Sequence, residues 1–310
     1  MSEHEHNAIE HQKDSRIEQI YAEALKQTKK DGGDPDKTRQ IPLLDGVSPE
    51  QTKKQIAESL ERMDSFIAVA DRDKAGGLKI SKETAEKIGS IWVFSGVGTF
   101  DQAIRPEDNR DLTPPFLEGT TRQRMNHAVL LSRRIAEAKS GKSLVLKGQA
   151  SAKEIKAHNQ KTKEILAQYG PRIIFGAFED QNKNAEEVLE REGMVIPKEN
   201  VTIVRMQNGE HMQSTADQVE NFYTPKEAMN KEVAIISNDI HLNRILLILA
   251  KAVEQYPGRL PGGKPVHLFP VPTRIDGREE FSIMEAVKAL EYIYEYRRAA
   301  KQPYPYVLDH

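Results

Sequence analysis

The stretch that decides the fold is residues 233–250, VAIISNDIHLNRILLILA. A short apolar run of strand type ends at Ser237, and a segment of helical length that is apolar on nearly every side follows. Such a strand, followed directly by such a helix, is typical of a parallel sheet covered on both faces. The polar side chains His241 and Arg244 lie near the start of this helix, and residues 245–250, which follow them, are all apolar. The pattern therefore predicts a site at this turn, because a solvated helix would carry its charges along a whole stripe.

Four other apolar runs of strand length alternate with helical segments, at residues 91–94, 172–175, 201–204 and 266–269. The segment 282–300 carries Ile283, Val287, Leu290 and Ile293 on one helical stripe, and we expect that stripe to pack on the sheet. This alternation predicts an α/β fold, a Rossmann-like three-layer sandwich with a mostly parallel sheet.

Residues 1–87 have a different texture and are expected to form a helical N-terminal extension. They are polar and helix-forming, with glycine-rich breaks, and Ser48 and Pro49 provide a helix start. About three helices are predicted there. Residues 88–310 are assigned to the α/β domain, with an insertion near 141–170 that contains a helix over 152–169. The run SLVL at 143–146 is either a further strand or part of a helical insertion.

Composition limits the classes of function. The 310 residues carry 45 basic and 47 acidic side chains, a formal net charge of −2, and no cysteine. The charge balance argues against nucleic acid as a partner, and the lack of cysteine excludes disulfides and thiolate chemistry. We expect no signal peptide, no membrane partner and a cytoplasmic location, because no apolar stretch approaches a membrane span.

Polar clusters follow the predicted strands. In an open parallel sheet ligands bind outside the carboxyl ends of the strands, so residues that follow different strands are expected to meet there. Glycines in such loops allow a ligand to approach the backbone. The alternative for each residue is a solvated loop or a helix cap. The predicted ligand-binding residues after the four strands are Ser95, Gly96 and Gly98; Glu179 and Asp180; Ser214 and Thr215; and Ser237 and Asn238.

The first turn of the helix near residue 240 is predicted to attract an anion. The unpaired N–H groups of a helix N-terminus favour negative charge, and Arg244 adds a fixed positive charge on the same side as His241. Asp217 is predicted to orient His241 or to bind a ligand hydroxyl. The alternative is an internal ion pair between Arg244 and a carboxylate such as Asp217. No metal site is predicted.

With these residues assembled, the chain from about residue 90 to 249 resembles the YdcF/SanA-like family, a domain of unknown function. The resemblance lies in IWVFSGVG at 91–98, in Arg124 near the start of the next helix, in STADQV at 214–219, and in IISNDIHLNRI at 235–245. The last segment carries Ser237, His241 and Arg244 at the family spacing. Ser214, Asp217 and Gln218 stand where the family has asparagine, glutamate and asparagine.

The resemblance implies a Rossmann-like fold with a polar pocket that includes Arg124. It also makes an adenosyl-type ligand, such as S-adenosylmethionine, a candidate.

Three functions follow as hypotheses. The first is binding of a small anionic or nucleotide-like metabolite at the strand carboxyl ends. The second is a hydrolase or transferase acting on a phosphate- or glycosyl-bearing substrate, with His241 as acid–base group oriented by Asp217. The third is a non-catalytic interaction protein that uses residues 1–87 and the tail at 301–310. The apolar residues of that tail, Tyr304, Tyr306 and Leu308, are expected to dock onto the same chain or a second subunit, so an oligomer is an open alternative.

Overall fold

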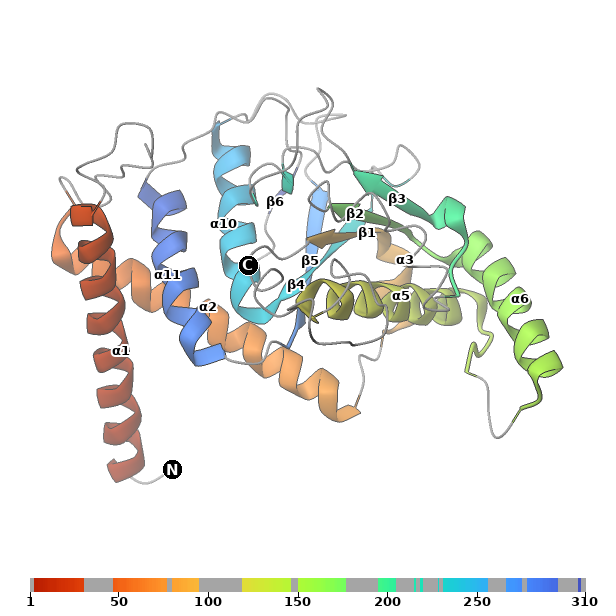
Figure 1. Cartoon of the computed structure of the whole chain (residues 1–310), viewed down its shortest axis with the longest axis horizontal. Helices are drawn as coiled ribbons and strands as arrows, with labels where there is room; N and C mark the ends of the chain where they lie inside the picture. The colour runs from red at the N-terminus through yellow and green to blue at the C-terminus, as the bar shows by residue number, and fades with distance from the viewer. Residues whose placement is uncertain are drawn as a thin grey trace, which may run out of the picture.

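A computed structural model shows an α/β architecture, with a parallel sheet between helical layers (Figure 1). The predicted Rossmann-like class is thereby confirmed. The structure describes residues 3–30, 47–76, 80–94, 119–145, 150–176, 195–204, 215, 218–219, 228, 231–255, 266–274, 278–294 and 306–307. Within these ranges no helix combines the length and the apolar character that crossing a bilayer would require.

The sheet has the strand order β3-β2-β1-β4-β5-β6, and all of its pairings are parallel. The five predicted strands are confirmed. The sixth, β6, lies in the C-terminal tail and pairs with the start of β5, so this part of the tail docks onto its own sheet. The strands are β1 (Ile88–Phe94), β2 (Arg172–Gly176), β3 (Val201–Val204), β4 (Glu232–Asn238), β5 (Val266–Thr273) and β6 (Tyr306–Val307).

The predicted helices are also present, and the starts at Ser48 and Ser151 follow the expected capping chemistry. The Ser48 hydroxyl accepts a hydrogen bond from the Gln51 amide at 3.1 Å, and Ser151 and Glu154 form a capping box. The helical elements are α1 (Glu3–Lys30), α2 (Pro49–Gly76), α3 (Lys82–Lys87), α5 (Gly119–Ser140), α6 (Ala152–Tyr169), the short 3-10 helix η3 (Lys198–Asn200), α10 (Asp239–Gln255) and α11 (Arg278–Tyr294).

Helix α5 covers one face of the sheet. Strand side chains two residues apart point to the same face, so one set meets α5 and the alternate set, which includes Trp92 and Phe94, is buried on the other side. The core under α5 contains Ile91, Val93, Ile173, Phe175, Ala234 and Ile236 from the strands, and Met125, Ala128, Leu131 and Ile135 from the helix.

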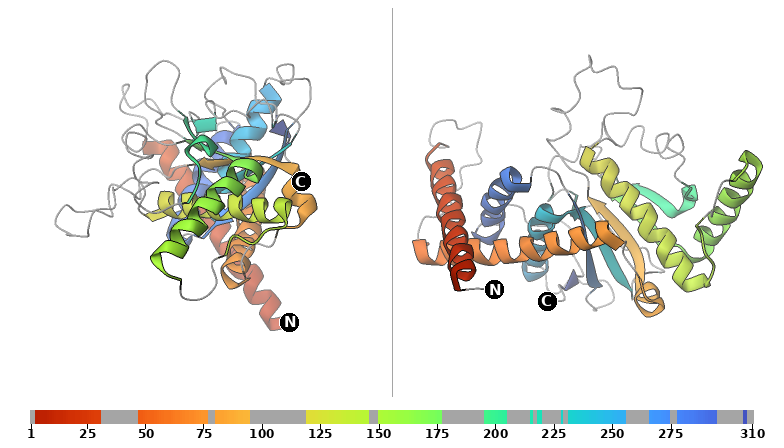
Figure 2. Two further views of the ribbon diagram at one scale, coloured as in Figure 1. Left: turned by 90° about the vertical axis from the view of Figure 1, so that its right-hand side faces the viewer. Right: turned by 90° about the horizontal axis from the view of Figure 1, so that it is seen from below.

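The N-terminal helices form part of the opposite helical layer. Helix α2 runs past α11 and α10 as far as β5, and α1 lies across it (Figure 2). The prediction that the apolar stripe of α11 packs on the sheet is wrong, because that stripe packs on α1, α2 and α10. A periodic apolar stripe shows that one face of a helix is buried, but it does not identify the element that covers that face. The shared core joins Ile20, Ile56, Leu60 and Met63 with Ile240, Ala286, Val287 and Leu290.

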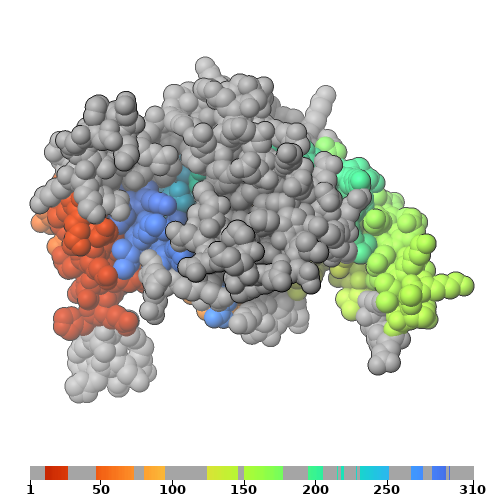
Figure 3. All heavy atoms as spheres, in the orientation of Figure 1, coloured from red at the N-terminus to blue at the C-terminus, as the bar shows by residue number. Residues whose placement is uncertain are grey.

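Helix α6 and α1 lie at opposite ends of the molecule (Figure 3). Helix α6 packs on α5 through a small cluster that includes Leu144, Ile165 and Leu166. Residues 141–145 form neither a strand nor a helix, so the strand alternative for the SLVL run is wrong over the part that the structure describes. The run belongs instead to an irregular part of the insertion, whose Leu144 packs on helix α6. The backbone amide of Leu144 donates a hydrogen bond to the Glu137 carboxylate, and this contact fixes the irregular segment on α5.

Candidate functional site

The candidate site lies at the carboxyl ends of β1 and β4. These neighbours are the switch point of the sheet, since β2 and β3 continue beyond β1 in one direction and β5 continues beyond β4 in the other. In open α/β sheets ligands bind outside the strands at this point. Strand β4 passes directly into α10, because Asn238 ends the strand and Asp239 begins the helix. The predicted arrangement of residues 233–250 is thereby confirmed.

Arg124, on the second turn of α5, joins the two strand ends. Its Nε donates to Asn238 Oδ1 at 2.8 Å, and its Nη1 donates to the Phe94 carbonyl at 2.6 Å. Asn238 Oδ1 also accepts from the Thr273 hydroxyl at 3.2 Å, so the end of β5 is tied to the same point. One guanidinium and one amide thus connect α5 with three strand ends.

The charge of Arg124 is almost fully buried, with 2% of the residue exposed. Burial lowers the pKa of its guanidinium to about 9; Glu285 and Asp239 oppose this electrostatically, whereas Arg244 adds to it. The group therefore remains a cation at neutral pH. Both hydrogen-bond acceptors that the described residues give it, a backbone carbonyl and a side-chain amide, are uncharged.

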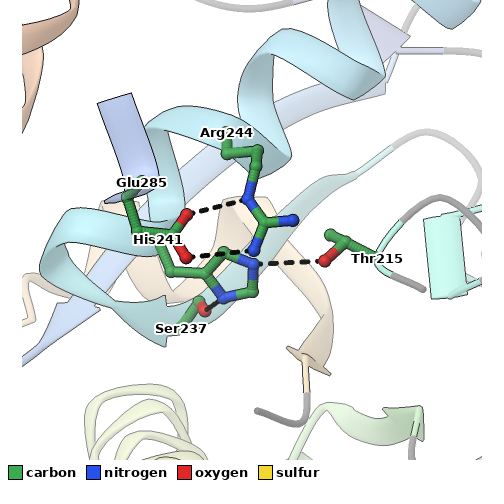
Figure 4. A network of polar contacts seen from close by, with 5 residues as sticks. All are labelled: Thr215, Ser237, His241, Arg244 and Glu285. Carbon is green, nitrogen blue, oxygen red and sulfur yellow. Dashed lines mark hydrogen bonds and ion pairs between the residues drawn. The ribbon is translucent and has the colours of Figure 1, made fainter. Parts of the chain in front are cut away.

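His241 lies in the first turn of α10 with a hydroxyl at each ring nitrogen (Figure 4). Its Nδ1 is 3.0 Å from Ser237 Oγ, and its Nε2 is 3.2 Å from Thr215 Oγ1. Burial holds the pKa of His241 well below the usual 6.5, and the cations Arg244, Arg124 and Lys288 lower it further. The imidazole is therefore neutral at pH 7. A catalytic role for His241 would thus begin from the neutral ring.

Arg244 forms an ion pair within the protein, and its partner is Glu285 of α11 (Figure 4). The pair is bidentate, with Nε 2.7 Å and Nη2 3.1 Å from the two carboxylate oxygens. This is the arrangement anticipated as the alternative to an anion site, although with a different carboxylate from Asp217. The helix N-terminus also has a negative partner in Asp239, whose Oδ1 accepts from the Ile240 amide at 2.9 Å.

Helix α2 contacts the same first turn of α10. Arg62 Nε donates to Asn243 Oδ1 at 2.8 Å, and Asn243 lies between His241 and Arg244 in sequence. Asn243 is buried, and its Nδ2 has no hydrogen-bond partner among the residues that the structure describes. The N-terminal helices therefore support the turn that carries the candidate site.

The structure brings together six of the predicted site residues: Arg124, Thr215, Ser237, Asn238, His241 and Arg244. The other predicted residues lie outside the described ranges, so their positions stay predictions. These are Ser95, Gly96, Gly98, Glu179, Asp180, Ser214 and Asp217.

Two residues of the site were missed from the sequence. Thr273 ends β5, and its signal was a polar residue directly after an apolar run, the same signal that identified the other strand ends. Glu285 lies within an apolar helical stripe, beside Ala286 and Val287, and is only 8% exposed. A charged residue inside such a stripe indicates a buried partner.

Within the described residues no group of three or more histidine, aspartate or glutamate side chains is placed to hold a metal ion. The charged and hydroxyl groups suit an organic or inorganic anion better. No protein-family model, curated protein or solved structure compared with the chain matches it.

Proposed function

We propose that the chain binds a small anionic metabolite, nucleotide-like or phosphorylated, at the carboxyl ends of β1 and β4. The observation that carries this proposal is Arg124, a buried cation at the switch point whose acceptors in the described structure are both neutral. A buried charge is costly unless other charges or ligands compensate it, and Glu285, one carboxylate acting on Arg124, is already paired with Arg244. An anion beside Arg124 would supply that compensation.

The sequence predicted that Arg244 binds the anion. We assign this role instead to Arg124, another of the predicted ligand-binding residues. Arg244 and Glu285 form the brace that holds α10 against α11, and Asn238 and Thr273 fix the position of the Arg124 guanidinium. A rigidly held cation loses little conformational freedom when a ligand arrives, which favours affinity.

Kinship with the YdcF/SanA-like family is part of the proposal. It is supported by the spacing of Ser237, His241 and Arg244 in a strand-to-helix junction, and by Arg124 on the helix that follows the first strand. S-adenosylmethionine therefore belongs in the panel of ligands to be tested, alongside nucleotides and sugar nucleotides.

The test is a set of binding isotherms and thermal melts with adenosine triphosphate, a uridine diphosphate sugar, S-adenosylmethionine and inorganic phosphate. A ligand that binds only the folded state stabilises it by about 2.7 kcal/mol at a hundredfold excess over Kd, so true binding raises the melting temperature measurably. We expect Arg124→Met to abolish this rise and Arg124→Lys to retain part of it, because lysine keeps the charge without the planar fork.

The matched control is Arg133→Met, which removes another partly buried arginine from the same helix. Each variant is first shown to be folded by circular dichroism and urea unfolding. If the parent protein binds none of these probes, or if folded Arg124→Met binds as tightly as the parent, the proposed function is wrong.

A further inference from the structure

The hydroxyl–imidazole–hydroxyl chain of Ser237, His241 and Thr215 can be given a direction. A neutral imidazole has one N–H and one bare nitrogen, so it donates one hydrogen bond and accepts the other. Two arrangements satisfy the observed distances of 3.0 and 3.2 Å. In one, Ser237 donates to Nδ1 and Nε2–H donates to Thr215; in the other, both bonds are reversed.

Burial of Ser237 distinguishes between these arrangements. Its side chain is completely inaccessible, and the contact of its Oγ within the described structure is His241 Nδ1. If Nδ1–H donated to Ser237, the serine hydroxyl hydrogen would be buried without an acceptor, which costs about as much as a lost hydrogen bond. Thr215 is also buried, but at 4% exposed it retains some accessible surface through which a ligand can accept its hydrogen, whereas Ser237 retains none. This difference favours the arrangement in which Ser237 donates to Nδ1 and the ring proton lies on Nε2.

We infer that this chain is a one-way hydrogen-bond relay, in which Ser237 donates to His241, His241 donates to Thr215, and the Thr215 hydroxyl donates to an oxygen of the bound ligand. The inference rests on the proposed function, since it assigns a ligand contact at the same site. The Thr215 oxygen accepts the hydrogen bond from Nε2–H, so the Thr215 hydroxyl hydrogen is available to a ligand.

The relay specifies the chemistry of the ligand. The site then offers the ligand a hydroxyl donor at Thr215 together with the Arg124 cation, whose charge acts on the same imidazole. Both complement an ionised oxyanion, either a phosphate or a carboxylate, which accepts hydrogen bonds and has none to donate. An ammonium group has no lone pair to accept from Thr215 and is repelled by Arg124, so it is excluded here.

The direct test is nitrogen NMR of the protein labelled at histidine, without ligand at pH 7, because the two ring nitrogens report which one carries the proton. We expect the His241 ring to be neutral with its proton on Nε2, and Ser237→Ala to change that assignment. A parent protein with its proton on Nδ1, or with an imidazolium ring, would overturn the relay.

The second test compares Thr215→Val, which removes the hydroxyl at nearly constant shape, with Thr215→Ser, which keeps it. The probes are inorganic phosphate, adenosine monophosphate and acetate, so that phosphate and carboxylate binding are measured separately. We expect Thr215→Val to weaken binding of whichever oxyanion binds the parent by about tenfold or more, and Thr215→Ser to retain most of the affinity.

The outcomes separate the two proposals. Binding that depends on Arg124 but is unchanged in Thr215→Val overturns the relay and leaves the proposed function standing. If the parent protein binds no anion, the proposed function and the ligand contact of Thr215 both fail. The tautomer measurement then still decides the direction of the hydrogen bonds between Ser237, His241 and Thr215.

Discussion

Replacement of Arg244 by methionine tests the architecture of the site quantitatively. The side chains of Arg244 and Glu285 are only 13% and 10% exposed, and two hydrogen bonds of 2.7 and 3.1 Å join them. Methionine preserves much of the apolar stem but leaves the Glu285 carboxylate desolvated without its bidentate partner. Removing one partner of a buried pair costs about 3–5 kcal/mol, and we expect the free energy of unfolding to fall by that amount.

Urea unfolding of the single and double variants measures this effect. Arg244→Met combined with Glu285→Met removes both charges, so we expect the double variant to regain most of the lost stability. The exposed pair of Lys87 and Glu83 is the control, and Lys87→Met should cost far less. If Arg244→Met costs as little as Lys87→Met, or if the double variant is no more stable than the single one, the interpretation of the pair as a buried brace is refuted.

Three further predictions concern stability. Burial holds the pKa of folded His241 well below 6.5, so between the folded and unfolded pKa values only the unfolded chain carries the extra proton. Stability therefore rises with pH up to about 6.5, by at most about 1.4 kcal/mol per pH unit. His241→Gln should flatten this slope in pH-dependent urea unfolding, and an unchanged slope would contradict the prediction. Gly170→Ala would place a Cβ 2.6 Å from the Leu166 carbonyl oxygen, and we expect a loss of about 1–3 kcal/mol in chemical denaturation. Arg62→Met removes the donor to buried Asn243, and a melting temperature equal to that of the parent would contradict the expected loss of about 1–3 kcal/mol.

The five predicted strands could be found in the sequence because each is a continuous apolar run between polar segments. All five predicted strands are present, and the junction at Asn238 and Asp239 lies where the polarity changes. Strand β6 was missed because a strand of two residues, Tyr306 and Val307, has too few positions to show a period. Its existence depends on pairing with β5, which is a non-local interaction.

The members of the site were easier to predict than their partners. Ser237, His241 and Arg244 were found because polar residues at a strand end and first helical turn stand out against an apolar background. Glu285, which pairs with Arg244 across 41 residues of sequence, was not found because nothing local to either residue specifies the other. The packing of α11 on α1, α2 and α10 was missed for the same reason.

The long-range core between the first two helices and the C-terminal half of the chain has a consequence for biosynthesis. Ile20, Ile56, Leu60 and Met63 are translated before the residues that complete their core, Ile240 and residues 286–290. At ~5–20 residues per second, the segment between α2 and α10 takes roughly 10–30 s to translate. Throughout that interval α1 and α2 can pair with each other but still expose the surface meant for α10 and α11. The apolar face shared by α1 and α2 therefore gains its α10 and α11 contacts only after most of the α/β domain has been made.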